Sequence, residues 1–299
     1  MAGLASRLAS RGHQVSLVTF EDSTRDRHPL DPSVHRVSIG IDPADANRNP
    51  FTRIRKRHRG LKTALGDLNA DVILSFCDRT NIDVLMAAGK LGIPIVVSER
   101  SDPNHQSLGV IWNTIRQHVY PRAAQVIALT EPSARLLRCF CGSVHVIPSA
   151  VDIPQAYSDR DAAGRQQLIV GAGRFAPEKG FDRLISAFAS VAKRHDQWRL
   201  TIFGDGPLRN DLQSQSRQLG IENRVSFPGW VTPLQDSIRD ATIFGLSSRY
   251  EGFPSVLLEA MSMGIPVVSV DCESGPREIV THESNGLLMQ STVQGLAEG

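Results

Sequence analysis

The chain has 299 residues, of which 41% are hydrophobic, with 33 Lys and Arg against 31 Asp and Glu. This length predicts about two domains, each with enough apolar material for its own core. The four cysteines stand at no spacing that indicates a disulfide framework or a zinc site. No apolar run approaches the roughly 18 residues of a membrane-spanning helix, and Met1 opens no charged-then-apolar leader, so we expect a cytoplasmic protein.

The net charge of +2 conceals an asymmetry between the two halves. Residues 1–150 hold 19 Lys and Arg against 13 Asp and Glu, whereas residues 151–299 hold 14 against 18. Only the first half has the excess positive charge that would attract an anionic partner. Most of its excess charge lies in residues 51–62 (FTRIRKRHRGLK), whose cations are Arg53, Arg55, Lys56, Arg57, Arg59 and Lys62.

This basic segment is a candidate for contact with the inner face of the cytoplasmic membrane. Each cation near an anionic lipid surface contributes about 1 kcal/mol. A solvated helix face or loop explains the segment equally well. Nucleic acid is disfavoured as a partner, because neither interleaved aromatic residues nor a recognised binding motif accompanies the charge.

Strands and helices alternate in the first half. The pattern predicts a helix that stops at Gly12 and a strand that follows it directly. The expected strands are residues 15–20, 71–75, 93–98 and 125–128, and the expected helices are residues 2–11, 82–90 and 132–138. Such alternation is typical of an α/β domain with buried parallel strands.

A proline-marked connector, residues 147–154, separates this half from a second α/β series. We therefore predict a first domain at residues 1–150, a linker at 151–164 and a second domain at 165–299. The expected strands of the second domain are residues 168–171, 199–203, 224–227, 242–246 and 266–270, and its helices are residues 180–193, 208–219, one from Pro254 and one from Pro276. A parallel sheet places ligands beyond the carboxyl ends of its strands, and four loops lie there: residues 171–180, 204–207, 247–254 and 271–276.

The segment from Glu251 to Glu259 joins a strand-to-helix turn to a carboxylate one turn inside an apolar helix. Apolar residues on every side of this helix predict that it is buried. An ionised Glu259 there is costly unless strong donors meet it, and those donors are either ligand hydroxyls or a structural Arg. The amides at the helix start favour phosphate, because the backbone N–H groups and the helix dipole both attract anions.

The loop at residues 171–180 follows a strand and opens a helix, as a dinucleotide-binding loop does. It fits that class poorly, because Ala176 replaces the third glycine and two cations, Arg174 and Lys179, are added. Arg174 and Lys179 suit a diphosphate, although solvated surface cations would look the same. Gly204 and Gly206 serve either a tight turn or the close approach of a ligand to the backbone.

These features together describe a way of holding a nucleoside diphosphate leaving group without a metal ion. No convincing Asp-x-Asp pair or His cluster accompanies them. When a sugar leaves its diphosphate, negative charge builds on the phosphate, so preorganised donors at that point lower the barrier. We therefore predict a glycosyl transfer site with no metal and no cofactor beyond the nucleotide-sugar substrate.

Residues 165–290 resemble the donor-binding domain of glycosyltransferase family 4, whose members are retaining enzymes of the GT-B architecture, with two Rossmann-like domains facing across a cleft. The matching stretches are residues 173–182 (GRFAPEKGFD), 203–207 (FGDGP), 248–261 (SRYEGFPSVLLEAM), 264–268 (GIPVV), 275–278 (GPRE) and 285–288 (NGLL). The resemblance implies that Arg174 and Lys179 hold the diphosphate, that Glu251 faces the transferred sugar and that Glu259 binds the ribose. It also implies that the turn around Pro254 lines the phosphate and sugar through the amides of Gly252, Phe253 and Ser255.

The first half is similar to the acceptor domain of the same family through residues 11–15 (RGHQV), 97–103 (VSERSDP) and 147–152 (IPSAVD). Many relatives have a histidine near Ser98, so Glu99 or Arg100 is either an acceptor-side group or a structural ion-pair member. His13 matches a structural turn of the family. The family usually begins with a strand and closes with a crossing helix, and the chain starts after the first and stops before the second. We therefore expect a first domain without its initial strand and a truncated chain with impaired activity.

The predicted function is transfer of a hexose or N-acetylhexosamine, with retention, from a UDP- or GDP-linked sugar to a glycan or lipid-linked glycan of bacterial surface polysaccharide. Three alternatives stay open. They are a GT-B enzyme that epimerises or hydrolyses a nucleotide sugar, a truncated nucleotide-binding protein without activity, and a Rossmann dehydrogenase.

Overall fold

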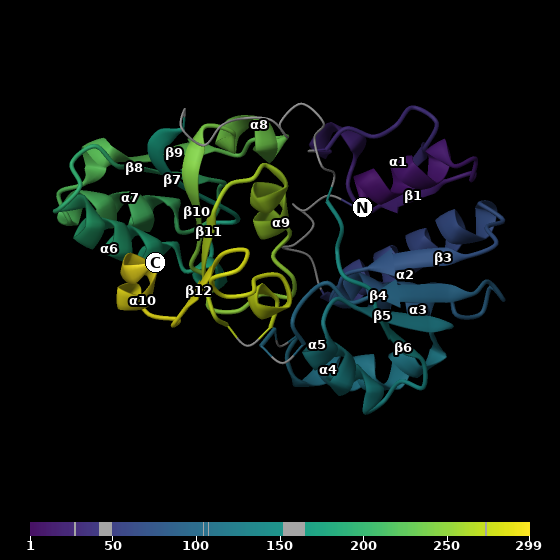
Figure 1. The fold of residues 1–299 in the computed structure, drawn as a ribbon. Coiled ribbons are helices and arrows are strands. Elements are labelled where there is room, and N and C mark those ends of the chain that lie inside the picture. The colour runs from purple at the N-terminus through teal and green to yellow at the C-terminus, as the bar shows by residue number, and fades with distance from the viewer. Residues whose placement is uncertain (27, 42–49, 104, 107, 152–164, 273) are drawn as a thin grey trace. The chain divides into compact units, whose positions relative to one another are not determined.

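The computed structural model describes residues 1–26, 28–41, 50–103, 105–106, 108–151, 165–272 and 274–299 (Figure 1). The chain divides into two units, Met1–Ile147 and Pro148–Gly299. The predicted linker at residues 151–164 lies outside the described residues, apart from its first position. Within the described ranges no helix combines the length and the apolarity needed to cross a bilayer.

The first unit contains two parallel sheets. Strands β1 (Ser16–Thr19) and β2 (His35–Ser38) pair with each other, and a four-stranded sheet has the order β3-β4-β5-β6. Its strands are β3 (Ile73–Phe76), β4 (Ile95–Ser98), β5 (Gln125–Ala128) and β6 (Val144–Val146). The helices are α1 (Ala2–Ser10), α2 (Pro50–Asp67), α3 (Asp78–Ala88), α4 (Val110–Val119) and α5 (Glu131–Arg138).

The core of the first unit fills the space between the four-stranded sheet and its helices. Ile82, Leu85 and Leu137 are fully buried against Val97 of the central strand β4. Near-continuous apolar strands of this kind are expected when helices cover both faces of a parallel sheet. The alternation predicted from the sequence is therefore confirmed as an α/β fold.

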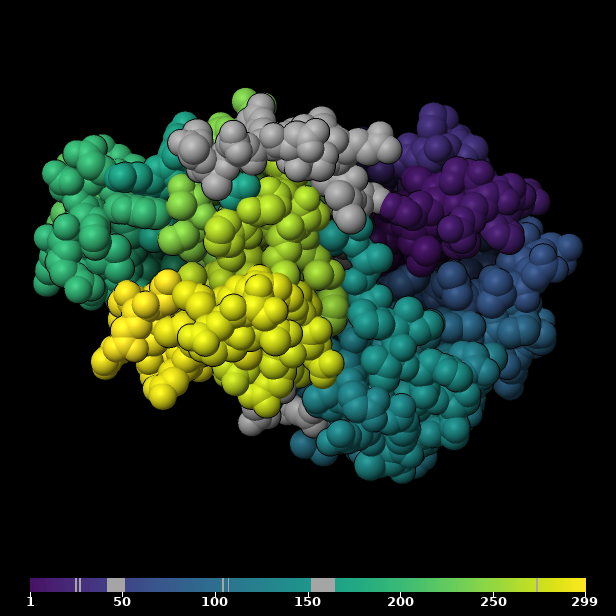
Figure 2. All heavy atoms as spheres, in the orientation of Figure 1, coloured from purple at the N-terminus to yellow at the C-terminus, as the bar shows by residue number. Residues whose placement is uncertain are grey.

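The second unit is built on one six-stranded parallel sheet with the order β12-β11-β10-β7-β8-β9. The strands are β7 (Gln166–Ala172), β8 (Arg199–Phe203), β9 (Val225–Gly229), β10 (Ala241–Leu246), β11 (Val267–Val270) and β12 (Leu287–Met289). The helices are α6 (Phe181–Ala192), α7 (Arg209–Gln218), α8 (Leu234–Ile238), α9 (Ser255–Ser262) and α10 (Val293–Glu298). Helix α10, yellow in Figure 2, lies at the surface of this unit against α6.

Helix α9 departs from the sequence prediction, which had it buried on every side. Leu257 and Ala260 are buried, whereas Val256, Leu258 and Met261 are only partly buried. The buried pair packs with Phe244 of the sheet in one apolar cluster. The prediction was wrong because apolar residues on all sides of a short helix do not ensure that neighbours cover all sides.

Glycines allow the turns at the carboxyl ends of strands β7 and β8 to touch. Gly204 has a φ of 135°, and a Cβ atom there would lie 1.9 Å from the carbonyl oxygen of Gly173. That oxygen belongs to the backbone and no rotamer change can move it. Only glycine therefore allows this approach.

We expect Gly204→Ala to lower the unfolding free energy of the second unit by about 3 kcal/mol, because backbone strain and overlap add. Gly220→Ala is the matched control, since Gly220 has a φ of 67° but open space around its Cβ position. That control should cost only about 1–2 kcal/mol. Urea unfolding of both variants measures the difference, and equal losses would contradict the steric argument.

Candidate functional site

Four loops of the second unit meet at the carboxyl edge of its sheet. They follow β7, β8, β10 and β11, as the sequence predicted. The backbone amide of Phe175 donates to the carbonyl of Asp205 at 2.9 Å, and a Cβ on Gly206 would lie 2.5 Å from the carbonyl oxygen of Phe175. A Cβ on Gly275 would lie 3.2 Å from the Cβ of Glu251, so the loop after β11 also approaches the one after β10.

Lys179 and Glu251, which are 72 residues apart, form the central ion pair of this edge. The Lys179 Nζ donates to both carboxylate oxygens of Glu251, at 2.8 and 2.9 Å. The side chains are 24% and 7% exposed, so the pair is largely withdrawn from water. A charge-assisted, bidentate contact in such surroundings fixes both side chains in one geometry.

Two serine hydroxyls hold Glu251 from other directions. The Ser248 Oγ donates to Oε1 of Glu251 at 2.6 Å, and the Ser274 Oγ donates to the Glu251 carbonyl oxygen at 2.6 Å. Both serines are buried. The carboxylate is therefore oriented by two donors, Lys179 and Ser248, and the backbone of Glu251 is held by Ser274.

A second ion pair joins the loop after β10 to helix α6. Arg249 donates through Nη1 and Nη2 to the two carboxylate oxygens of Asp182, at 2.9 and 2.7 Å. The Arg249 amide donates to the Glu178 carbonyl at 2.8 Å, and the Ser247 Oγ donates to the Lys179 carbonyl at 3.0 Å. These contacts keep Lys179 beside Glu251.

Arg174 lies at the same edge but points to a different partner. Its Nη2 donates to Oε1 of Glu178 at 2.6 Å, and its side chain is 70% exposed. A surface pair of this kind contributes about 0–1 kcal/mol and reorients easily. The predicted role of Arg174 at a diphosphate stays a prediction.

Glu259 lies one turn into α9 and is partly buried. Burial raises its pKa, and among the described residues no Lys, Arg or His lowers it. Within the described part of the chain its carboxylate accepts no hydrogen bond. A carboxylate that is kept in a desolvated place without a protein partner is typical of a functional site rather than of a structural one.

The turn between Glu251 and α9 offers free backbone donors. Within the described residues, the N–H groups of Gly252, Phe253 and Ser255 have no hydrogen-bond acceptor. Pro254 is the N-cap of α9, so the helix begins at Ser255, one residue later than predicted. Unpaired amides at the start of a helix attract anions, because the helix dipole adds to their own.

Among the described residues, no group of three or more His, Cys, Asp or Glu side chains is placed to hold a metal ion. Asp271, in the loop after β11, pairs with Arg277 at 2.9 Å.

Glu99, one of two candidate acceptor-side groups, is buried in the first unit. Its carboxylate accepts from the Tyr120 hydroxyl at 2.9 Å and from the Ser101 hydroxyl at 2.7 Å, and Arg116 lies 3.9 Å away. Burial raises the pKa of Glu99. Both carboxylate oxygens of Glu99 thus have hydrogen-bond partners, and Arg100, the other candidate, is half-buried beside it. An acceptor-side role for either residue stays a prediction.

Four residues around the Lys179–Glu251 pair were missed by the sequence analysis: Asp182, Ser248, Arg249 and Ser274. Asp182, Arg249 and Ser274 act through contacts between segments that are distant in sequence, whereas Ser248 lies only three residues before its partner Glu251. Asp182 and the Ser248–Arg249 pair do lie inside the stretches that carry the family resemblance. Their place inside these stretches was the available indication that they matter, although it does not show which side chains are in contact.

The comparisons with known proteins identify the family and the fold. The model for glycosyltransferase family 4 matches residues 1–155, and the model for glycosyl transferases group 1 matches residues 155–299. Anabaena Alr3699/HepE, solved in complex with UDP and glucose, superposes with a TM-score of 0.79 at 22% identity, over 99% of this chain and 83% of that one. The fold is thus that of a GT-B glycosyltransferase.

Among the similar proteins, two with named activities bear on the reaction. The Salmonella typhimurium lipopolysaccharide 1,6-galactosyltransferase is 42% identical over 125 residues, which are 40% of this chain and 34% of that protein. A Campylobacter jejuni α-1,4-N-acetyl-D-galactosaminyltransferase that acts on a diNAcBac-PP-undecaprenol glycan is 25% identical, over 93% of this chain and 76% of that protein. The chain belongs to glycosyltransferase family 4.

We expect Lys179→Met to lower the unfolding free energy of the second unit by about 3 kcal/mol, because it leaves the buried Glu251 carboxylate without its countercharge. Adding Glu251→Gln should recover at least half of that loss, since no unpaired charge remains. Arg174→Met, which removes an exposed guanidinium, should change stability by less than about 0.5 kcal/mol. Urea unfolding at neutral pH measures all three, and a double variant no more stable than Lys179→Met would contradict the ion-pair account.

Proposed function

We propose that the second unit binds a nucleotide sugar, UDP- or GDP-linked, and that the protein transfers its hexose or N-acetylhexosamine to a glycan or lipid-linked glycan with retention of anomeric configuration. The observation that carries this proposal is the Lys179–Glu251 pair beside the unpaired amides of Gly252 and Phe253. A cation, open amides and a fixed carboxylate meet at one sheet edge, where such folds bind nucleotides.

Each charged group has one part of the donor as its natural partner. The diphosphate takes the Lys179 ammonium and the amides of the turn, and Arg174 swings from Glu178 to the same phosphates. Glu251, released by Lys179, then accepts from hydroxyls of the sugar. Glu259 accepts from the ribose hydroxyls, which supply the donors that the protein does not give it.

The reaction needs no protein nucleophile. The bond between the anomeric carbon and the phosphate oxygen breaks on the same face from which the acceptor oxygen attacks. The acceptor proton passes to the departing phosphate oxygen, and a new bond joins the anomeric carbon to the acceptor oxygen. Lys179, Arg174 and the amides stabilise the charge that develops on the phosphate, so these groups replace a metal ion.

A lipid-linked acceptor of bacterial surface polysaccharide is the class that we favour. The named activities of the Salmonella and Campylobacter relatives belong to lipopolysaccharide and to an undecaprenol-linked glycan. Contact of the first unit with the inner face of an anionic membrane would suit such an acceptor. Of the cations proposed for it, Arg55, Lys56 and Arg59 are exposed on α2, and Arg53 is half-buried. Arg57 instead pairs with Asp83 at 2.7 Å and is unsuited to this role.

Product analysis separates transfer from the rival functions. Incubation with a UDP- or GDP-sugar and a glycan acceptor should give a lengthened glycan and free nucleoside diphosphate. A changed sugar on the nucleotide would indicate an epimerase, and free sugar without an acceptor product would indicate a hydrolase. Nucleotide binding without any product would indicate a nucleotide-binding protein that has no activity.

We expect Glu259→Gln to stabilise the second unit at neutral pH and to weaken the binding of a nucleoside diphosphate. Burial raises the Glu259 pKa in the folded state, so its ionisation opposes folding as the pH rises above the pKa of the unfolded chain. The gain in thermal midpoint should therefore appear at pH 7.5 and vanish toward pH 4, where both states are protonated. The loss of a charged hydrogen bond to the ribose should weaken binding by about tenfold.

Glu222→Gln is the control for both measurements, because Glu222 is exposed in the same unit. It should change neither the thermal midpoint nor the dissociation constant. If Glu259→Gln raised the midpoint but left the affinities for UDP and GDP unchanged, the ribose assignment would be wrong.

A further inference from the structure

The second unit has a hollow at the amino ends of β7, β8 and β9, on the sheet edge opposite to the Lys179–Glu251 pair. Its volume is about 360 Å³, which falls within the range of small-ligand sites. Strand β7 is 7 residues long, so about 20 Å separate the hollow from the loops at the carboxyl edge. The hollow is therefore distinct from the candidate donor site.

The strand in the middle of this hollow, β8, has one polar face. Leu200 and Ile202 are buried in the cluster that β8 forms with α6 and α7. Between them the side chain of Thr201 points to the other face, where its hydroxyl lies 2.8 Å from that of Ser226 on β9. Interior strands of a parallel sheet are usually apolar on both faces, because helices cover both. The polar face of β8 is thus a departure that core packing does not explain.

Helices α8 and α9 cover only the carboxyl half of this face. There Val170 and Phe203 are buried in one cluster with Leu257 of α9. Toward the amino ends of the strands, Gln166 and Ser226 are exposed. The amino half of the face is therefore open to a ligand.

Amide side chains dominate the polar lining of the hollow. They belong to Gln166, Gln167, Gln197 and Asn223. Among the described residues, none of these four side chains has a hydrogen-bond partner. An amide group has two donor hydrogens and an acceptor oxygen, so it can bond two neighbouring hydroxyls of one ring. Leu168, which is half-buried, adds an apolar surface for the C–H groups of such a ring.

The charge of the lining favours a neutral ligand. The described lining residues include no carboxylate. The Arg224 guanidinium donates to the carbonyl oxygens of Trp198 and Ala192, at 3.0 and 2.8 Å, and is thus engaged by the backbone. Arg199 is exposed and donates to the Asn223 carbonyl at 3.3 Å. One exposed guanidinium is a weak basis for binding phosphate, whereas amides and hydroxyls match a polyhydroxyl ligand.

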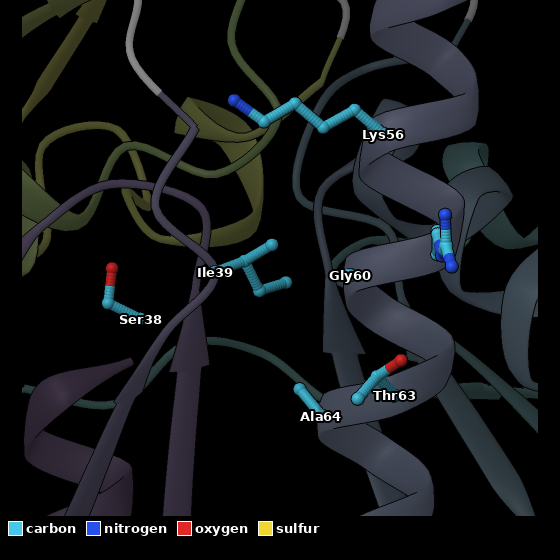
Figure 3. Close-up of a pocket in the computed structure, with 7 residues that line it drawn as sticks. Ser38, Ile39, Lys56, Gly60, Thr63 and Ala64 are labelled. Carbon is cyan, nitrogen blue, oxygen red and sulfur yellow. The ribbon is translucent and has the colours of Figure 1, made fainter.

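A hollow in the first unit, between β2 and α2, has a different lining (Figure 3). Its volume of about 390 Å³ is similar. Its described lining includes Lys56 and Arg59 but no amide side chain, and Ile39 and Ala64 form its apolar sides (Figure 3). The amide-rich lining is therefore a property of the second-unit hollow and is not shared by the other.

We propose that the second-unit hollow binds a short segment of a neutral glycan, away from the edge where transfer would occur. The inference goes beyond the proposed function and rests on it only for the source of the glycan, which would be the acceptor polymer. The amides and the Thr201–Ser226 hydroxyl pair bond the sugar hydroxyls, and Leu168 contacts the C–H face of the ring. A glycan held there keeps the protein beside its acceptor between transfers.

The test applies the whole labelled protein to an array of neutral oligosaccharides from bacterial surface polysaccharides, with UDP and GDP in excess. Calorimetry then gives the dissociation constant of the glycan that is retained most. Gln166→Ala/Asn223→Ala should weaken its binding by about tenfold, because two amides that bond the sugar are lost. Ser226→Trp, which fills the hollow from an exposed position, should weaken it by about tenfold or more. The control Gln218→Ala/Gln290→Ala removes two exposed amides of the same unit outside the hollow, and should change binding by less than about twofold.

The affinities of the same variants for UDP and GDP separate this site from the donor site. They should equal those of the wild-type protein, because the hollow lies at the opposite edge of the sheet. A wild-type protein that binds glycan but neither nucleotide would contradict the proposed function and support the glycan site. Retention of no glycan on the array would overturn the glycan site. Equal glycan affinity in the wild-type protein, Gln166→Ala/Asn223→Ala and Ser226→Trp would overturn it as well.

Discussion

The ion pair between Lys179 and Glu251 is the interaction on which the second unit's site depends. It joins the loop after β7 to the loop after β10, and both side chains would be costly in this place without each other. Glu251 is further fixed by Ser248 and Ser274, and Lys179 by the loop that Arg249 and Asp182 hold in place. The pair thus holds a positive and a negative group side by side at this edge. In the proposed complex, the diphosphate of the nucleotide sugar would bind Lys179 and the sugar hydroxyls would bind Glu251.

The parallel sheet explains why residues so far apart in sequence meet. Strands β7, β8, β10 and β11 run in the same direction, so their following loops lie at one edge. Glycines at these loops bring the backbones into contact, as Gly204 does with Gly173. Glu259 stays partly buried one turn inside the helix that begins at the same edge, which costs stability in the absence of a partner. Under the proposed function, the ribose hydroxyls of a bound nucleotide would offset that cost.

Much of this arrangement was predictable from the sequence, because apolar strands alternating with helices determine which loops share an edge. The α/β class and the family were confirmed, and the predicted strands of the second unit lie within a few residues of the observed ones. The contacts of the site were not predictable in the same way. Nothing in the spacing of Lys179 and Glu251 shows that they face each other, and Ser274 and the Arg249–Asp182 pair act through tertiary contacts alone. The prediction that α9 is completely buried was wrong for a related reason. The local sequence pattern does not show which other segments pack against a helix.

The central claim is that a nucleoside diphosphate takes the place of Glu251 as the partner of Lys179. The most direct measurement is a crystal structure of the protein with bound UDP or GDP. It should place the Lys179 Nζ within hydrogen-bonding distance of a phosphate oxygen, with the ribose hydroxyls on Glu259. A nucleotide bound at another edge, with the Lys179–Glu251 contact unchanged, would contradict the account.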